Sequence, residues 1–343
     1  QWVQAFNDRK IVDSLLMLNW QTLYPISTYT KSDADDKNYE GKFSFEEKPV
    51  FPHMTSTQAG KNYSIISSTP YGNYMSLQFA EKALKEEKMG TNDVTDFLTV
   101  SLSSPDYIGH QFGPNSIEVE DNYLRLDRDL ASFFAFLDKQ YGKDYTVFLT
   151  ADHGVAQVPG FTSEHHLPGG LFNSYSNDAI RSIGKGLGIE NLISNVSNNQ
   201  IYINLKAIDS AKLDARKIKS EIIKVLHQFP EVYFAFDNSD LSSVALPFEV
   251  KEKFIKGYHP KLSGDIQVIL KSNYFSGAKT GTTHGSWYPY DSHIPCVFMG
   301  WGVKPGKLFR ETYMSDIAPT ISALLKIQMP SGSIGKPIFE MMK

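Results

Sequence analysis

The fold of this chain is decided at Tyr145–Gly154, which reads Tyr-Thr-Val-Phe-Leu-Thr-Ala-Asp-His-Gly. β-Branched and aromatic residues dominate its first six positions, and this composition predicts a buried central strand. Asp152 and His153 follow, where the strand gives way to a loop. Ligands of open α/β sheets bind at the carboxyl ends of the strands, so this pair is a candidate metal site. We expect the rest of the chain to build the sheet beneath this pair or to bring further ligands to it.

The preceding segment predicts a second strand of the same sheet. Asp96–Leu102 has the length and composition of a strand, and a polar loop over Ser103–Pro114 follows it. Ile117–Lys139 has apolar residues at a spacing close to 3.6, which indicates a long helix. Strand, helix and strand in this order predict a right-handed βαβ unit with parallel strands. The loop after each strand then leaves the same edge of the sheet.

The composition is that of an ordinary globular protein. The 343 residues are 41% hydrophobic and 21% charged, and the formal charge of −4 is too small to indicate a nucleic-acid or membrane partner. No apolar run is long enough for a transmembrane helix. The single cysteine, Cys296, excludes an internal disulfide, and its apolar neighbours predict a buried thiol.

The pattern of predicted helices, strands and turns divides the chain into three parts. Residues 1–160 are expected to form an α/β core with metal-ligand loops, including helices at Gln1–Leu18 and Asn73–Lys88, the latter capped by Asn73, and a charged surface loop at Lys31–Lys48. Residues 161–280 are expected to be an inserted α+β cap subdomain, because many turns separate their short elements. Residues 281–343 are expected to return to the core with a last ligand loop, a strand at Pro295–Met299 and a helix at Ser315–Leu325.

Two carboxylate–histidine pairs follow the two predicted strands. Asp106 and His110 lie within one turn of each other, and their side chains can reach a common point. Carboxylate oxygens and imidazole nitrogens are standard zinc ligands. Either pair taken alone also fits a capping aspartate beside a surface histidine. Two pairs at neighbouring strand ends instead favour a two-metal site of the kind used in phosphoryl transfer.

Of the other histidines, His284 is a further candidate metal ligand, and His293, His165 and His166 are expected to have other roles. His284 lies in the small-residue loop Gly-Thr-Thr-His-Gly, which would let the backbone approach a metal closely. His293 and Asp291, just before the last core strand, are expected to support the ligands or the local structure. His165 and His166 lie in a loop of the cap and are candidates for the mouth of the site. The chain contains no Gly-rich phosphate loop, no Gly-x-Ser-x-Gly motif and no Cys-x-x-Cys pair.

These motifs together resemble the alkaline phosphatase superfamily of metal-dependent hydrolases. The resemblance is carried by Ser-Pro-Asp-Tyr-Ile-Gly-His-Gln-Phe-Gly-Pro ending at Pro114, by Thr-Ala-Asp-His-Gly ending at Gly154, and by Thr-Thr-His-Gly ending at Gly285. The stretches Glu118–Leu130, His293–Gly300 and Thr312–Ile327 resemble its bacterial zinc-dependent phosphomonoesterase branch. The resemblance covers the chain from about Trp2 to Pro337. It implies an alkaline-phosphatase-like α/β fold, a central and mostly parallel sheet flanked by helices.

The resemblance also implies two zinc sites. Asp106, His110 and His284 would hold one zinc, and Asp152 and His153 would contribute to the second. In the family, a Thr or Ser nucleophile activated by the second zinc becomes phosphorylated and is then hydrolysed. The family places that nucleophile, a further zinc-binding Asp and the phosphate-holding residues upstream of everything present here. We therefore expect that the N-terminal third of the family domain is lacking and that this chain alone is inactive, with one zinc or none well held.

Several functions stay open from the sequence. The resemblance favours a phosphomonoesterase, with a phosphodiesterase, nucleotide pyrophosphatase or phosphonate hydrolase on the same metals as the alternative. A mutase-like or sulfatase-like member lacks visible support, and a non-catalytic metal-binding fragment is the alternative of another class. The resemblance implies a small phosphorylated substrate and a periplasmic or secreted location. Apolar core left exposed would be covered by the missing N-terminal part or by a dimer mate.

Overall fold

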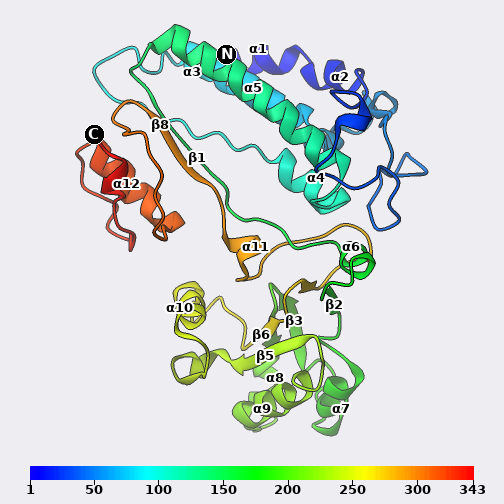
Figure 1. The fold of residues 1–343 in the computed structure, drawn as a ribbon. Helices are drawn as coiled ribbons and strands as arrows, with labels where there is room; N and C mark the ends of the chain where they lie inside the picture. The colour runs from blue at the N-terminus through cyan, green and yellow to red at the C-terminus, as the bar shows by residue number, and fades with distance from the viewer.

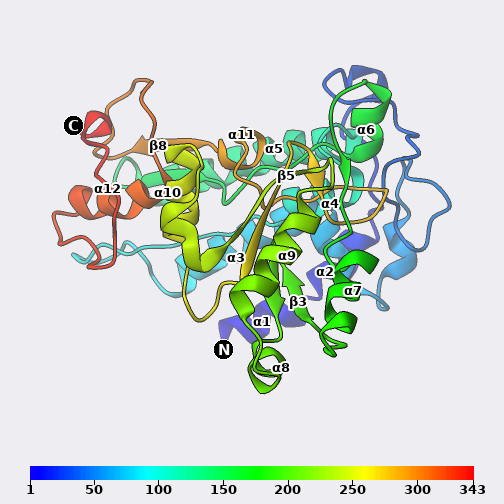
Figure 2. The same cartoon turned by 90° about the horizontal axis from the view of Figure 1, so that it is seen from below.

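The structure is a computed structural model that describes all 343 residues, and it has two lobes (Figure 1). The upper lobe holds the N-terminal helices, one long two-stranded ribbon and the C-terminal helix. The lower lobe is the cap. Figure 2 looks up from the cap and shows its helices α7, α9 and α10 in front of the layer formed by α3 and α5. None of the helices is both long and apolar enough to cross a membrane.

Helices make up most of the upper lobe. Short 3₁₀ turns lie at Ile26–Thr28, Thr55–Gln58, Tyr63–Ser68, Met314–Asp316 and Phe339–Met341. The α-helices are α1 (Trp2–Asp8), α2 (Ile11–Leu16), α3 (Tyr71–Glu86), α4 (Ser104–Phe112), α5 (Ile117–Tyr141), α6 (Pro159–Glu164), α11 (Pro289–Ser292) and α12 (Ile317–Leu324).

The strands form three small sheets. β1 (Thr146–Thr150) pairs antiparallel with β8 (Cys296–Gly300), and β2 (Gly170–Leu171) pairs parallel with β7 (Tyr274–Phe275). The cap holds an antiparallel four-stranded sheet in the order β3-β4-β6-β5. Its elements are α7 (Asp178–Gly186), β3 (Ile193–Ser197), β4 (Gln200–Ile203), α8 (Leu205–Ser210), α9 (Ala215–Leu226), β5 (Val232–Asp237), a 3₁₀ turn at Asn238–Ser243, α10 (Phe248–Gly257) and β6 (Ile266–Leu270).

The cap has its own hydrophobic core. Helix α9 shows how the sequence builds it, because Ile218, Ile222 and Leu226 recur every four residues and all three are buried. Asp214 caps the helix by accepting from the backbone N–H of Arg216 at 2.9 Å. The apolar side of α9 packs on the sheet, with Ile266 fully buried in the same cluster. Each such side chain contributes about 1.5–3 kcal/mol of hydrophobic stabilisation.

Helix α5 is the longest element and organises the upper lobe. Ser116 caps it by accepting from the N–H of Val119 at 3.2 Å, and Gly142 ends it with a positive φ of 63°. Its buried Phe133 and Leu137 pack against Leu77 and Leu84 of α3. The α3–α5 pair therefore forms a rigid layer on which the N-terminal segments lie.

A buried carboxylate ties the N-terminal segment to α5. Asp121 is fully buried and accepts hydrogen bonds from Trp20 Nε1 at 2.7 Å, from the backbone N–H of Leu23 at 2.6 Å and from the hydroxyl of Tyr29. Arg125, one turn later, donates to it at 2.6 Å and balances its charge. These contacts satisfy the carboxylate from four directions.

Several sequence-based expectations are wrong in detail. Ser103–Pro114 was expected to be a loop but contains α4, because Pro105 suits a helix N-terminus and Asp106 lies in the first turn. Asp96–Leu102 is not a strand: Leu98, Val100 and Leu102 face the α3–α5 cluster in alternation, but the segment has no strand partner. The parallel βαβ unit is therefore not formed, although the mixture of helices and sheet agrees with the predicted α/β class.

The predicted core strands exist but are not buried. β1 and β8 match the expected ranges closely, yet Leu149 is 37% exposed and Val297 is 51% exposed. Cys296, expected to be a buried thiol, is exposed. The reason is that β1 and β8 pair only with each other. Val147 reaches the α3–α5 cluster and Phe148 lies beside Phe97, but no further strand covers the outer edges of the ribbon.

The N-terminal part also differs from expectation. The helix expected over Gln1–Leu18 is broken into α1 and α2, because Lys10 takes a left-handed conformation with φ of 48°. Asn73 lies inside α3 and does not cap it; its side chain is buried and donates to Asn122 at 3.0 Å. The charged segment Lys31–Lys48 is irregular but only partly a surface loop, since it buries Glu40 and Phe43.

We predict that Asp121→Ala lowers the free energy of unfolding by roughly 3–5 kcal/mol, because it leaves Arg125 and three further donors without their acceptor. Urea denaturation followed by tryptophan fluorescence measures the effect. Asp127→Ala, on the exposed side of the same helix, is the control and should change stability by less than about 0.5 kcal/mol. Equal effects of the two substitutions would contradict the importance of the buried network.

Candidate metal centre

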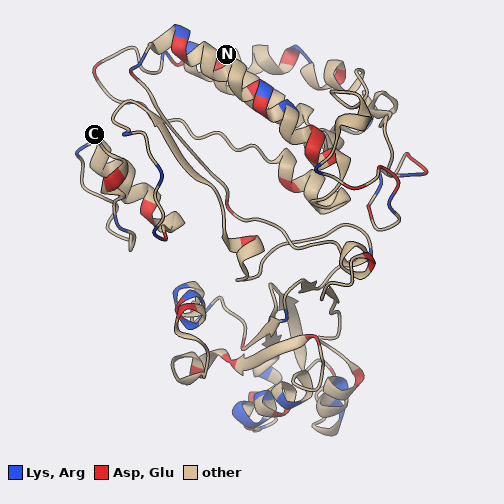
Figure 3. Cartoon of the chain, viewed as in Figure 1, with Lys and Arg blue, Asp and Glu red and all other residues tan.

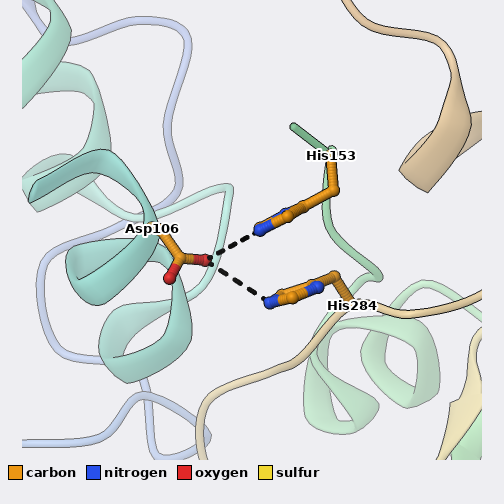
Figure 4. A group of neighbouring side chains, drawn as sticks. All are labelled: Asp106, His153 and His284. Carbon is orange, nitrogen blue, oxygen red and sulfur yellow. Dashed lines mark ion pairs between the residues drawn. The ribbon is translucent and has the colours of Figure 1, made fainter. Parts of the chain in front are cut away.

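Three side chains from three separate segments meet in the upper lobe. Asp106 comes from the first turn of α4, His153 from the loop after β1, and His284 from the loop before α11 (Figure 4). One potential ligand atom from each lies within 4.8 Å of the others. Asp106 Oδ1 is the common point, at 3.8 Å from Nε2 of both histidines.

His110 joins this group from the same helix as Asp106. The two residues are four apart on α4, so their side chains share one face, and His110 Nε2 lies 3.3 Å from Asp106 Oδ1. On its other side, His110 Nδ1 lies 2.8 Å from the backbone carbonyl oxygen of Thr282. Nδ1 therefore carries a hydrogen and donates to Thr282, and Nε2 is the nitrogen that faces the carboxylate.

The same arrangement fixes the orientation of His153. Its Nδ1 lies 2.8 Å from the carbonyl oxygen of Gly154, so this nitrogen donates and Nε2 faces Asp106. The ring of His153 stacks on that of His284 at a centroid distance of 3.4 Å and an angle of 9°. Burial lowers the pKa of His284, and the neighbouring His153 lowers it further, so the imidazole is held neutral.

The backbone next to His284 is locked against α4. The N–H of Thr282 donates to the carbonyl of His110 at 3.0 Å, and Gly281 has a positive φ of 70°. A Cβ on Gly281 would lie 2.2 Å from the carbonyl oxygen of His110. Only glycine fits this close approach, so the small-residue loop noted in the sequence has a specific structural role.

Asp291 supports the His284 loop from behind. It is buried, and its Oδ2 accepts from the backbone N–H groups of Gly285 at 3.0 Å and Ser286 at 2.6 Å, directly after His284. Its own backbone carbonyl accepts from the N–H of Gly154 at 2.7 Å, directly after His153. One aspartate thus connects the two histidine loops.

The other candidates lie outside the cluster. Asp152 is at its edge, with Oδ2 at 3.4 Å from His153 Nε2 and a side chain that is 85% exposed. His293 is exposed and makes no hydrogen bond or ion pair with the cluster. His165 and His166 are exposed on the cap side, where His165 stacks on Phe161 at 4.1 Å. Sequence reasoning missed the carbonyl of Thr282, because no side-chain pattern marks a backbone acceptor.

The donor set suits a transition metal. Nε2 of His110, His153 and His284 lies 3.3, 3.8 and 3.8 Å from Asp106 Oδ1, and nitrogen and oxygen donors gathered in this way can bind a cation. Histidine nitrogen with carboxylate oxygen is the ligand combination preferred by Zn²⁺ over Mg²⁺ or Ca²⁺. The residues present therefore fit a zinc-like ion.

Known proteins resemble this chain over nearly all of its length. Alkaline phosphatase PhoV of Synechococcus elongatus is 49% identical over 100% of this chain and 62% of its own length. A Myroides odoratus protein described as a calcium-transporting ATPase is 46% identical over 99% of this chain and 64% of its own. Alkaline phosphatase PafA of Elizabethkingia meningoseptica is 44% identical over 99% of this chain and 63% of its own.

The fold agrees with these relationships. The crystal structure of wild-type PafA superimposes with a TM-score of 0.95 at 44% identity, covering 100% of this chain and 66% of that chain. The predicted α/β, alkaline-phosphatase-like fold is thereby confirmed, and the chain spans less than two thirds of the length of the curated relatives. Residues 2–291 match the type I phosphodiesterase / nucleotide pyrophosphatase family, and the chain belongs to that family.

Proposed function

We propose that this chain is the larger part of a metal-dependent phosphate monoester hydrolase, an alkaline phosphatase. The observation that carries the proposal is the convergence of His110, His153 and His284 on one carboxylate oxygen of Asp106. The descriptions of PhoV and PafA as alkaline phosphatases support the choice of reaction. A small phosphorylated molecule is the proposed substrate, and a periplasmic or extracellular location is proposed with it.

The proposed ligands divide between two zinc ions. Asp106, His110 and His284 would hold one, and Asp152 and His153 would contribute to the other. A bound zinc pair supplies electrostatic stabilisation of the phosphoryl oxygens. The chain's own contribution is orientation: the carbonyls of Thr282 and Gly154 fix the tautomers of His110 and His153, so each Nε2 lone pair points to the cluster.

The nucleophile is proposed to lie outside these 343 residues. A serine or threonine hydroxyl that attacks phosphorus must lie beside the metal ligands, yet none forms a hydrogen bond with Asp106, His153 or His284. A phosphorylated Thr or Ser supplied by the rest of the protein would be the covalent intermediate. On this proposal the 343-residue chain alone is inactive.

A phosphodiesterase is the second candidate, because the matching family is described by that activity. The geometry of the candidate metal ligands does not separate monoester from diester hydrolysis, since both reactions use the same kind of metal cluster. Discrimination depends on the groups that meet the non-bridging oxygens, which we propose to lie outside this chain.

We predict that the uncovered ribbon is buried in the complete protein. Phe97 lies beside Phe148 of β1 at 6.0 Å, and β1 and β8 expose Leu149 and Val297. A groove of about 790 Å³ beside Met299 has room for covering side chains. We propose that polypeptide from the remainder of the full-length protein covers this surface, since its relatives are longer.

The test introduces Leu149→Lys in the full-length protein. If other polypeptide covers β1, the buried ammonium should lower stability by roughly 2–4 kcal/mol, measured by thermal or urea unfolding. Phe248→Lys, on α10 at 71% exposure, is the matched control and should be nearly neutral. A neutral Leu149→Lys would contradict covering of the ribbon, and a concentration-dependent loss of stability would point to a second copy as the occupant.

For metal binding, we predict about two zinc ions per full-length chain and a loss of at least one in Asp106→Asn, because the substitution removes the central anionic ligand. Metal analysis after dialysis measures the stoichiometry. His165→Ala is the control, since His165 contacts Phe161 and not the cluster. Unchanged zinc content in Asp106→Asn would contradict the proposed centre.

For activity, we predict that the full-length protein hydrolyses an aryl phosphate monoester with a kcat/KM roughly 10²-fold or more above that for a bis-aryl diester. Asp106→Asn should lower monoester turnover by at least about 10²-fold, because charge stabilisation is lost. A preference for the diester would favour the second candidate. Two bound zinc ions with monoester turnover by the 343-residue chain alone would contradict a nucleophile outside it.

A further inference from the structure

A second cluster of ionisable groups lies away from the metal centre, where the irregular segment after α2 packs on the start of α5. Glu40 is 5% exposed, and both His53 and Glu118 are fully buried. Asp35 and Glu46 complete the group. Figure 3 shows acidic residues along the irregular segment and at the start of α5. The group thus contains four carboxylates and one imidazole, and only Glu46 and Glu118 contact the imidazole directly.

His53 neutralises only part of this charge. Its Nδ1 lies 2.9 Å from Glu46 Oε2 and its Nε2 lies 3.1 Å from Glu118 Oε1. Burial alone would lower the pKa of His53, but the hydrogen bonds from Glu118 and Glu46 outweigh it and raise the pKa to about 9. One imidazolium thus serves two carboxylates and leaves a surplus of negative charge.

The surplus falls on three oxygens that have no hydrogen-bond partner: Asp35 Oδ1, Glu40 Oε2 and Glu118 Oε2. Burial, followed by repulsion from Glu118, raises the pKa of Glu40 to about 9. Lys37, three residues before Glu40, is engaged elsewhere, with Nζ at 2.6 Å from Glu164. Buried carboxylate oxygens without a donor or counter-ion are strongly unfavourable.

A neighbouring amide can add a further oxygen. The side chain of Gln111 packs against Gly41, next to Glu40, and its Nε2 is buried without a partner. The two ends of an amide side chain are interchangeable by a flip. The flip would place its carbonyl oxygen where the unpaired Nε2 now lies.

We propose that Glu40, Glu118 and Asp35 bind a hard divalent cation of the Ca²⁺ class, separate from the histidine-rich centre. The candidate ligands are oxygens only, and Ca²⁺ takes six to eight oxygens in flexible geometry. The three oxygens do not form a group within 4.8 Å of one another, so binding draws the side chains together or retains water ligands. A proton on Glu40 would remove one charge but would leave the other two oxygens unpartnered.

The position of the site gives the cation a structural role. The backbone N–H of Gly41, directly after Glu40, donates at 2.7 Å to the carbonyl of Gln111, directly after His110. Glu118 lies in the first turn of α5. A cation shared by Glu40 and Glu118 would therefore fasten the irregular segment to the two helices that flank Gly113, and so hold α4 in place.

Terbium luminescence in the full-length, zinc-loaded protein tests the proposal. Tb³⁺ replaces Ca²⁺ at oxygen sites, and Trp20, whose ring is 5.0 Å from that of His53, would sensitise its emission. We expect sensitised emission that excess Ca²⁺ abolishes. Glu40→Gln should weaken Tb³⁺ binding at least about tenfold, because affinity depends on the number of charged ligands. Glu47→Gln, an exposed acidic neighbour in the same segment, should not change it.

Two further measurements make the outcome decisive. Asp106→Asn should keep the Tb³⁺ signal, because the histidine cluster is a different site; loss of the signal in that variant would overturn the proposal. Ca²⁺ should raise the Tm of the wild type and not that of Glu40→Gln. Absence of both the Tb³⁺ emission and the Ca²⁺-dependent Tm shift would show that protons or water alone satisfy the cluster, and would also overturn it.

Discussion

The candidate metal centre depends on one backbone junction, where residues 281–282 pack against the end of α4. The N–H of Gly281 donates to the carbonyl of Tyr39 at 3.0 Å, and the N–H of Thr282 donates to the carbonyl of His110 at 3.0 Å. These bonds join three segments that are more than sixty residues apart in sequence. They fix the His284 loop directly against α4, which carries Asp106, while Asp291 ties the same loop to that of His153. Side-chain identity alone therefore does not make this site; the close approach of two main chains does.

The two ionisable clusters solve the problem of buried charge in different ways. At Asp106 the neighbouring groups are imidazoles, whose ring nitrogens suit a borderline metal. The outer nitrogens of His110 and His153 are fixed by backbone carbonyls. At Glu118 the neighbours are other carboxylates, and a single imidazolium is too little charge to balance them. The difference between the two sites follows from the ratio of histidines to carboxylates in each. The histidine-rich centre at Asp106 suits a zinc-like ion, and the carboxylate cluster at Glu118 suits a hard cation.

The candidate ligand residues could be singled out from the sequence because their spacing is local. Asp106 and His110 are one helical turn apart, and Asp152 and His153 are adjacent, so either loop or helix brings each pair together. The strand pairing was not predictable from the sequence. The alternation of Leu98, Val100 and Leu102 shows which side chains face a core, but it does not show whether the backbone pairs with another strand. The prediction that Cys296 is buried was wrong for a related reason. Its apolar neighbours imply that other elements cover the strand, but β8 pairs only with β1. The acidic cluster was missed because a charged segment without periodicity predicts a surface loop, and only tertiary contacts show that some of its carboxylates are buried.

The pairing of β1 with β8 has a consequence for how the polypeptide acquires its structure. Thr146 pairs with Gly300, so the ribbon closes a loop that contains the entire cap. Such non-local pairing is slow, because the entropy of loop closure is lost before the contacts form. The cap has a self-contained core that can form first and shorten the effective loop. During synthesis on the ribosome, β1 must therefore wait unpaired until the cap has emerged. In this interval a strand with Val147, Phe148 and Leu149 in sequence is open to association with other chains, so newly made protein is most vulnerable to aggregation at this stage.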